Sequence, residues 1–344
     1  MSETDYGRGR FLRDAGLAFA GAQLAMLGTA NAATVPAIEP GTHTSFASIK
    51  QINAGLLNIG YADLGPPDGK PVLLLHGWPY DIHSFVDVAP LLAAQGYRVI
   101  VPYMRGFGST TFLSNSTFRN GQQSVCALDV TALMDALEIK TAIIGAFDLG
   151  ALSGDIVAAL WPERCKGLVS VSGYLIGSPA ANSMPSVPQF EHAFWYQYYF
   201  STKTGLEGYA KYLDAFNKYI WQLSSPKWNF SDATYDRSAA AFNNPDQVAI
   251  ITHHYRWRIG VAKGESKYDD LEKRLAARPT ISVPAITMEG DANGAAHAPP
   301  AAYRAQFTGK YDQRTLTGGI GHDLPQEAPQ AFAQAIVDVD GFAS

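Results

Sequence analysis

One stretch of sequence decides the fold of this chain: Thr141-Ala142-Ile143-Ile144-Gly145-Ala146-Phe147-Asp148-Leu149-Gly150-Ala151. The short apolar, β-branched run predicts a buried strand, and the residues after Asp148 are compatible with a helix. Small residues flank Asp148, as a tight strand-to-helix turn requires, because the turn forces its central residue into an unfavourable conformation without room for neighbouring side chains. Such a turn, a nucleophile elbow, presents one reactive side chain at the end of a strand.

Asp148 occupies the reactive position, and its carboxylate determines which chemistry the turn can support. With an ordinary pKa of ~3.9, the side chain is an anion at neutral pH and needs no base to become a nucleophile. A carboxylate reacts well at an sp3 carbon that carries a leaving group, and the product is an ester. Water activated by a histidine must then attack that ester, while an oxyanion hole holds the charge. Alternatively, Asp148 only caps the start of a helix.

Two further motifs lie where this mechanism needs them. Pro71-Val72-Leu73-Leu74-Leu75-His76-Gly77-Trp78-Pro79 is a buried-strand pattern that ends in a His-Gly turn. Gly318-Gly319-Ile320-Gly321-His322-Asp323-Leu324-Pro325 places a histidine in a glycine-rich loop before the last predicted helix. We therefore assign the activation of water to His322 and expect His76 only to shape its turn.

These motifs, with Arg105-Gly106-Phe107-Gly108-Ser109, resemble those of α/β-hydrolases of the epoxide hydrolase and haloalkane dehalogenase group. The resemblance extends from about Phe46 to Val339. It implies an α/β fold, in which helices flank a mostly parallel sheet and a helical cap is inserted. It also implies an oxyanion hole formed by the backbone amides of Trp78 and Leu149.

The resemblance places the acid that orients His322 in the loop after the penultimate strand, within Pro284–Gly294. We expect Asp291 to fix the tautomer of His322 and to stabilise its cationic form. In many relatives the acid falls slightly later, at the position that Asn293 occupies here. Glu289 is the alternative acid, although its predicted place is on the strand itself.

An aromatic segment from about Ile176 to Lys267 separates the possible reactions. Opening an epoxide produces an alkoxide, so a proton donor must bind the ring oxygen, and a phenol with a pKa of ~10 stays protonated at neutral pH. Epoxide hydrolases use two cap tyrosines for this. The segments Tyr196-Gln197-Tyr198-Tyr199-Phe200 and Tyr255-Arg256 resemble those that carry them, which assigns the role to Tyr196 and Tyr255. Both tyrosines can equally be packing residues of cap helices.

A dehalogenase is the alternative on the same scaffold. Haloalkane dehalogenases similar to this chain supply N–H donors to the halide from a Trp after the nucleophile and an Asn after the His-Gly turn, or from a cap tryptophan. Leu149 and Trp78 occupy the first two positions here. Fluoroacetate-type enzymes bind their substrate with arginines at the positions of Leu149 and Leu152. We therefore expect hydrolysis of an apolar or aromatic epoxide to a diol, with a haloalkane or haloacid dehalogenase, or a non-catalytic binding protein, as alternatives.

The composition agrees with an enzyme that acts on a small molecule. The 344 residues are 47% hydrophobic, enough for a sizeable core, and the net charge of −5 provides no basic surface for nucleic acid or an anionic membrane. Cys126 and Cys165 lack metal-ligand spacing and are expected to be free, mostly buried thiols. We find no phosphate-binding glycine loop or zinc motif, so we expect no metal and no cofactor. The expected partners are an apolar substrate and water, without stable membrane insertion.

Alternating patterns predict a sheet covered by helices on both faces. The predicted strands are Ser48–Ile52, Leu56–Asp63, Val72–Leu75, Arg98–Pro102, Thr141–Ala146, Gly167–Ser172, Ala285–Glu289 and Asp312–Leu316. The predicted helices are Ser124–Leu137, Leu149–Trp161, Gly208–Leu223 and Pro325–Val339. We expect residues 46–175 to form the first part of the core, 176–267 the helical cap, and 268–341 the second part of the core.

Residues 1–32 are not part of this fold. Arg8-Gly9-Arg10-Phe11-Leu12-Arg13 precedes a weakly apolar stretch, Ala15–Gly28, which is followed by Ala30-Asn31-Ala32. This order is typical of an export signal peptide. It resembles a twin-arginine signal in which Gly9 stands at the place of the second adjacent arginine. The apolar stretch is too short to span a membrane. We expect export to the periplasm, with a cytoplasmic enzyme carrying a short extension as the alternative.

Overall fold

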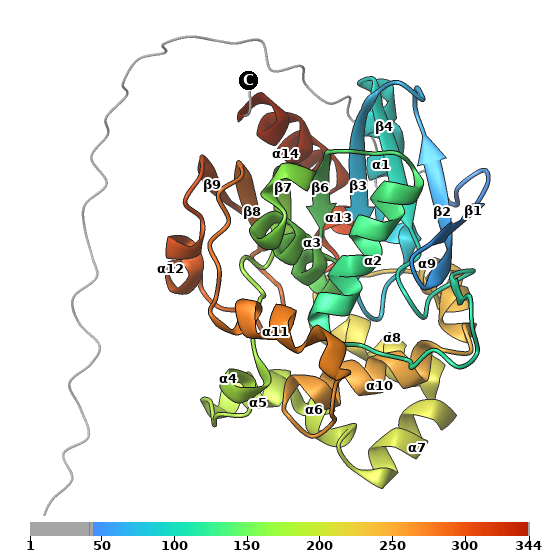
Figure 1. Cartoon of the computed structure of the whole chain (residues 1–344), viewed down its shortest axis with the longest axis vertical. Helices are drawn as coiled ribbons and strands as arrows, with labels where there is room; N and C mark the ends of the chain where they lie inside the picture. The colour runs from blue at the N-terminus through green and yellow to red at the C-terminus, as the bar shows by residue number, and fades with distance from the viewer. Residues whose placement is uncertain (1–40, 42–43, 343–344) are drawn as a thin grey trace, which may run out of the picture. The chain divides into compact units, whose positions relative to one another are not determined.

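The central sheet determines where a site can form. The computed structural model describes residues 41 and 44–342, so the expected export signal at residues 1–32 lies outside the described residues. Within them, nine strands form one sheet in the order β1-β2-β4-β3-β6-β7-β8-β9, and β5 pairs with β2 (Figure 1). The strands are β1 (Lys50–Ala54), β2 (Leu57–Leu64), β3 (Lys70–Leu75), β4 (Tyr97–Pro102), β5 (Thr111–Phe112), β6 (Ala142–Ala146), β7 (Cys165–Val171), β8 (Ala285–Gly290) and β9 (Tyr311–Leu316).

The pairing of the strands brings two of the sequence motifs together. β1, β2 and β4 pair antiparallel, whereas β4, β3, β6, β7, β8 and β9 pair in parallel. In the parallel pair β3 and β6, Val72 lies beside Ile143 and Leu75 beside Ala146. The two strands therefore end at the same edge of the sheet. The His-Gly turn after β3 and the elbow after β6 are consequently neighbours.

Helices cover both faces of the sheet, because alternate strand residues point to opposite sides. Val72 and Leu74 of β3 pack in one buried cluster with residues of α1 and α14, whereas Leu73 and Leu75 pack in another with residues of α2 and α3. The α-helices are α1 (Val88–Ala94), α2 (Gln123–Ala136), α3 (Asp148–Leu160), α4 (Pro179–Asn182), α5 (Pro188–Ala193), α6 (Trp195–Tyr199), α7 (Lys203–Lys211), α8 (Leu213–Ser224), α9 (Asp232–Ala239), α10 (Gln247–Arg258), α11 (Asp269–Ala276), α12 (Pro300–Tyr303), α13 (Leu324–Glu327) and α14 (Pro329–Phe342). Short 3₁₀ turns occupy Ile82–Phe85, Pro162–Arg164, Ala240–Asn243, Ser266–Tyr268 and Arg304–Gln306.

The helices α4 to α11 all belong to the chain between β7 and β8, and most of them lie together below the sheet in Figure 1.

The predicted helix Gly208–Leu223 is wrong in its bounds. α7 begins earlier, at Lys203, because the Thr202 side chain caps it by accepting from the Gly205 N–H, and Tyr212 separates α7 from α8 with φ −117° and ψ 32°.

The eight predicted strands are confirmed to within two residues at each end, and β5, which has only two residues, was not predicted. The predicted helices before and after the elbow are confirmed as α2 and α3. The predicted helix Pro325–Val339 is divided into α13 and α14. Ala328 separates them because it precedes Pro329, and a residue before proline is driven out of the helical region.

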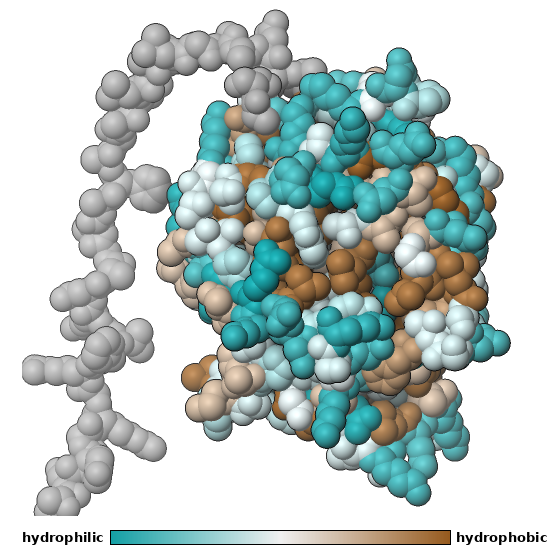
Figure 2. Space-filling view, viewed as in Figure 1, coloured by the Kyte–Doolittle hydropathy of each residue, from teal (hydrophilic) through white to brown (hydrophobic). Residues whose placement is uncertain are grey.

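The surface carries hydrophobic residues in patches among hydrophilic ones, as the visible face in Figure 2 shows. The large hydrophobic residues with the greatest exposure include Met184 and Val187, which lie between α4 and α5. Scattered exposure of this kind is normal for a folded protein and does not by itself indicate a partner. Among the described residues, no helix combines the length and the apolar character that crossing a membrane would require.

Candidate active site

The elbow has the strained geometry that its sequence predicts. β6 ends at Ala146, and α3 begins at Asp148, whose φ of 53° lies in the left-handed region that residues with a side chain rarely adopt. The turn after β3 approaches this residue closely. A Cβ atom at Gly77 would lie 2.2 Å from Oδ1 of Asp148, so only glycine fits there. The strain and the close approach together fix the Asp148 carboxylate at the ends of β3 and β6.

Each oxygen of the Asp148 carboxylate has its own partner. The backbone N–H of Trp78 donates to Oδ1 over 2.8 Å, and Nε2 of His322 lies 3.2 Å from Oδ2. Leu149 follows in the first turn of α3, where backbone N–H groups have no acceptor within the helix. The positive end of the helix dipole also lies here and favours negative charge. The two backbone amides expected in an oxyanion hole therefore flank Asp148, and the histidine faces its other oxygen.

Packing, rather than an acid, holds the ring of His322. The ring lies 5.9 Å from each of the rings of Tyr80 and Phe147, and the backbone N–H of His322 donates to Oγ of Ser225. Only 6% of its side chain is exposed. Nδ1, the nitrogen that an orienting acid would bind, is buried without a hydrogen-bond partner among the described residues.

The prediction that Asp291 orients His322 is wrong in this structure. The Asp291 carboxylate accepts the backbone N–H groups of Gly318, Gly319 and Ile320 over 2.8 to 3.1 Å. Desolvation is the largest effect on its pKa and raises it, but the three N–H groups together lower the pKa below the ordinary value. Asp291 therefore holds the loop that leads to His322, and it does not contact the imidazole. Sequence alone could not separate these roles, because both place an acid beside the same loop.

The alternative acid, Glu289, is also bound elsewhere. It lies at the end of β8, where its Oε1 accepts from Nδ2 of Asn293 over 2.6 Å and its Oε2 lies 3.6 Å from Nε2 of His297. Asn293 also donates to Oγ of Ser172, the residue that follows β7. The hydroxyl of Ser172 and the amide of Asn293 thus lie just after β7 and β8, and Glu289 accepts a hydrogen bond from that amide.

A small cavity is lined by Asp148, His322 and both predicted tyrosines. Its volume is about 80 Å³, which is well below the ~300–1,000 Å³ of sites for drug-sized ligands. The lining residues come from the strand ends and from the inserted helices. They are Asp148, Leu149, Leu152, Ser172, Leu175, Phe194, Tyr196, His254, Tyr255, Arg258, Ala295, Ala296 and His322.

The two tyrosines come from different helices and lie against one another. Tyr196 of α6 and Tyr255 of α10 have ring centroids 4.9 Å apart, and each ring lies 5.2 Å from the ring of Trp78. Desolvation raises the pKa of both phenols above the ordinary value, and the negative charge of Asp148 raises it further. Both phenols therefore stay protonated at physiological pH and can donate hydrogen bonds into the cavity.

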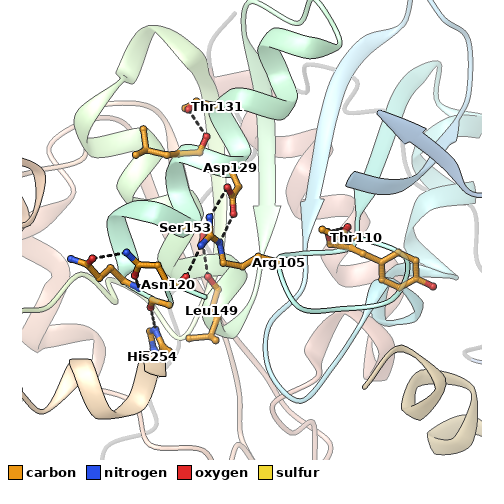
Figure 3. Close-up of polar contacts among 12 residues, drawn as sticks. Arg105, Thr110, Asn120, Asp129, Thr131, Leu149, Ser153 and His254 are labelled. Carbon is orange, nitrogen blue, oxygen red and sulfur yellow. Dashed lines mark hydrogen bonds and ion pairs between the residues drawn. The ribbon is translucent and has the colours of Figure 1, made fainter. Parts of the chain in front are cut away.

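Two adjacent histidines attach α10 to the core. Gly121 donates its N–H to Nδ1 of His253. The ring of His254 donates from Nδ1 to the carbonyl of Gly121, so that the residue before Tyr255 is fixed (Figure 3). Desolvation by burial lowers the pKa of His254 to about 4, so its ring is neutral at physiological pH. A Cβ at Gly121 would lie 2.6 Å from the carbonyl oxygen of Ile250, which explains the glycine.

The loop that carries Gly121 is in turn held by Arg105. Its guanidinium pairs with both oxygens of Asp129 on α2 and donates to the carbonyl of Asn120 (Figure 3). The sequence motif around Arg105 is therefore structural, and it fixes the core side of the contact with α10. His76 is structural too, as predicted. It accepts from the N–H of Met104 and donates to the Gly77 carbonyl within its own turn.

Comparison with known proteins agrees with this geometry. A family model of the α/β hydrolase fold matches residues 70–217. A solved structure from Klebsiella pneumoniae, described as a candidate epoxide hydrolase, is 59% identical, and the match, with a TM-score of 0.85, covers 86% of this chain and 98% of that chain. The chain belongs to the α/β-hydrolase family.

Curated relatives match over a shorter stretch. Epoxide hydrolase B of Mycobacterium tuberculosis is 34% identical over 156 residues, which are 41% of this chain and 43% of the relative. A haloalkane dehalogenase of Psychrobacter cryohalolentis is 34% identical over 108 residues, 31% of this chain and 35% of the relative. The α/β-hydrolase chain thus spans less than half of the length of these curated relatives.

Three polar residues of this α/β-hydrolase cavity were missed by sequence reasoning: Ser172, His254 and Arg258. Arg258 lies three residues after Tyr255 on α10, a spacing that places both side chains on one face of a helix. That spacing was the signal that could have found it. Ser172 is marked only by following a parallel strand, and no spacing distinguishes His254.

A second, larger cavity of this α/β-hydrolase, about 750 Å³, is open to solvent and lies between the α7–α8 segment and α9. Asp214 and Asp236 line it, but no histidine does, so it lacks the pairing of a nucleophile with a base. Among the described residues, no cluster of three or more acidic, histidine or cysteine side chains is placed to hold a metal ion. The small cavity around Asp148 is therefore the candidate active site.

Proposed function

We propose that this chain is an epoxide hydrolase that forms an ester on Asp148 and releases a diol. The observation that carries the proposal is that two protonated phenols, Tyr196 and Tyr255, line the same cavity as the Asp148 carboxylate, which lies at a nucleophile elbow. A carboxylate nucleophile needs a carbon with a leaving group. Two phenols suit a leaving group that develops negative charge on oxygen.

In the first step Oδ2 of Asp148 attacks a ring carbon, because Oδ1 is already bound by the N–H of Trp78. A C–O ester bond forms, the C–O bond of the ring breaks, and the electron pair moves to the ring oxygen. Tyr196 and Tyr255 hydrogen-bond that oxygen, and one of them transfers its proton to it. The charge of Asp148 has then moved to a phenolate.

In the second step Nε2 of His322 takes a proton from water, and the hydroxide attacks Cγ of the Asp148 ester. The charge develops on Oδ1, where the N–H groups of Trp78 and Leu149 stabilise it. Collapse of this intermediate breaks the ester bond, and the imidazolium protonates the departing alkoxide. The carboxylic acid left on Asp148 returns its proton to the phenolate. The balance is one epoxide and one water consumed and one diol formed.

A dehalogenase is the second candidate function, supported by the haloalkane dehalogenase among the relatives. The cavity favours it less. The indole N–H of Trp78, which could otherwise bind a halide, donates to the hydroxyl of Tyr209 over 2.7 Å. Leu149 and Leu152 bring aliphatic side chains to the positions of halide or carboxylate donors. The described residues that line the cavity include no tryptophan. A non-catalytic binding protein would not need the pairing of Asp148 with His322.

The test uses the full chain with a panel of epoxides and a panel of haloalkanes, and diol and halide are measured together. A single turnover in oxygen-18 water should place the label in the Asp148 carboxylate and not in the first diol, because water attacks the enzyme ester. Label in the first-turnover product would mean that water attacks the substrate directly. Release of halide without diol from any epoxide would favour the dehalogenase.

We also propose that residues 1–32 direct export to the periplasm. The support is the order of a basic segment, an apolar stretch and Ala30-Asn31-Ala32 in the sequence. Fractionation of cells that express the full chain, with amino-terminal sequencing of the mature protein, tests this proposal. An uncleaved protein in the cytoplasmic fraction would contradict it.

A further inference from the structure

A cation lies in the wall of the active-site cavity. Arg258, near the end of α10, lines it together with Asp148, Tyr196 and Tyr255. Nη1 donates to Oε1 of Gln197 over 2.7 Å, and the guanidinium lies 4.3 Å above the ring centre of Phe194. These two contacts fix the plane of the guanidinium, as a binding group requires.

The charge of Arg258 lacks a carboxylate partner. Among the described residues, no acidic oxygen lies within 4.0 Å of it, and its Nε and Nη2 donate to no other group. Glu191 is the acidic residue that acts on its charge, but the Glu191 oxygens already accept from the Tyr198 hydroxyl and the Ser186 N–H. A guanidinium has five N–H donors, so four remain for a ligand.

The buried guanidinium of Arg105, which has a structural role, has a carboxylate partner that Arg258 lacks. The Arg105 side chain is 2% exposed, and it pairs with both oxygens of Asp129. Arg258 is partly buried and has no such pair, and desolvation by the surrounding protein lowers its pKa. A partly desolvated charge without a counterion is destabilising, and an anionic ligand supplies the missing charge.

We infer that Arg258 binds a carboxylate on the substrate, so that the enzyme acts on small epoxides that carry an anionic group. A carboxylate matches the planar fork of a guanidinium, which can bind it through two parallel hydrogen bonds. The inference rests on the proposed function and narrows its substrate class. It replaces the expectation of an apolar substrate that the aromatic sequence suggested.

The size of the cavity and its charges support the same class. A volume of about 80 Å³ admits a ligand of only a few carbon atoms. In so small a cavity a substrate carboxylate lies close to the carboxylate of Asp148, and like charges repel. The positive charge of Arg258 in the same wall offsets this repulsion. A three-carbon epoxide with its carboxylate on the ring, glycidate, is the simplest probe of this arrangement.

The test compares glycidate with glycidol, which has the same carbon skeleton but no charge. The full-length parent should show the higher kcat/KM on glycidate. Arg258→Gln should lower the ratio of the two kcat/KM values roughly 10-fold to 150-fold, the loss expected for hydrogen bonds between charged groups. Arg258→Lys should keep part of the preference. Lys203→Gln removes the same charge from the exposed surface of α7 and should leave the ratio unchanged.

A binding measurement separates failure of this inference from failure of the proposed function. Calorimetry should detect binding of glycerate, the hydrolysis product of glycidate, to the parent protein. Arg258→Gln should lose this binding, while its circular dichroism spectrum should match that of the parent. Binding of this kind without turnover of any epoxide would retain the anion site and reject the epoxide hydrolase. Hydrolysis of both epoxides with equal losses in Arg258→Gln would reject the anion site, because Arg258 would then act only on the phenols. Absence of glycerate binding to the parent would also overturn the inference.

Discussion

Removal of the two phenol hydroxyls tests the ring-opening step directly. Tyr196→Phe and Tyr255→Phe delete the proposed donors and leave both aromatic rings in place. The rings pack on each other at 4.9 Å and on Trp78 at 5.2 Å, and the ring contacts persist when the hydroxyls are removed. The two hydroxyls also hydrogen-bond each other, and each substitution removes only this one bond. We therefore expect the thermal unfolding temperature of each variant to stay close to that of the parent.

The expected magnitude follows from what each hydroxyl does in the transition state. Loss of one of two donors to a developing oxyanion typically costs ~2–4 kcal/mol, which corresponds to a rate reduced roughly 30-fold to 1000-fold. Each single variant should show a reduction in this range. In the double variant the ring oxygen has no phenol donor, and alkylation should nearly cease. The second step uses His322 and water, so these variants should hydrolyse an ester already formed at an unchanged rate.

The measurement is the rate of ester formation on Asp148 in a single turnover, followed by mass spectrometry of the quenched protein. Epoxides and haloalkanes are compared on the same variants, because departure of a halide needs no proton. A double variant that opens epoxides at the parental rate would refute the assignment of both tyrosines. Equal losses on epoxides and haloalkanes would show that the hydroxyls shape the cavity and do not donate to the leaving group.

Three further outcomes are expected. His322→Gln should still form the ester on Asp148 but accumulate it, seen as a stable mass adduct, and full turnover by this variant would remove His322 from the mechanism. Asp291→Asn should lower the unfolding temperature, because the carboxylate binds three backbone N–H groups, and should keep most of the ester hydrolysis in a stopped-flow assay. Burial raises the pKa of Asp155 from 3.8 to about 8, so the folded state retains a proton that the unfolded state loses, and the free energy of unfolding should fall as pH rises from about 4 to about 8, by at most on the order of 5 kcal/mol. Asp155→Asn should flatten this slope in urea unfolding at several pH values, and an unchanged slope would contradict the assignment.

The parts of the fold that short-range rules determine were predicted from the sequence. β6 and α3 follow from an apolar run, small residues and a helix-compatible segment. The break between α13 and α14 was missed, although Pro329 marks it locally. The separation of α7 from α8 at Tyr212 carries no comparable marker, because the apolar spacing continues across it. The boundary of the inserted helices at residues 176–267 stays a prediction.

The candidate site was predictable where a residue stands at the functional position of a sequence motif. Asp148 and His322 fall into motifs, and the structure brings them within 3.2 Å of each other. Asp291 was not predictable in the same way, because its role depends on which of two groups in one loop its carboxylate reaches. Arg258 was missed for a related reason. Its spacing from Tyr255 places both side chains on one face of α10, but only the folded chain shows that this face lines the cavity and that no acid pairs with the guanidinium.

The most unusual feature of the site is the free Nδ1 of His322. Ser172 and Asn293 occupy the ends of β7 and β8, and Glu289 is bound to Asn293, so no described carboxylate reaches Nδ1 of the imidazole. Packing against Tyr80 and Phe147 can fix the position of the ring, but it cannot stabilise the positive charge that develops when His322 takes a proton from water. An acid partner normally provides both. Ester formation needs neither, because a carboxylate attacks carbon without a base to activate it. The architecture therefore supports opening of the substrate ring more fully than hydrolysis of the ester.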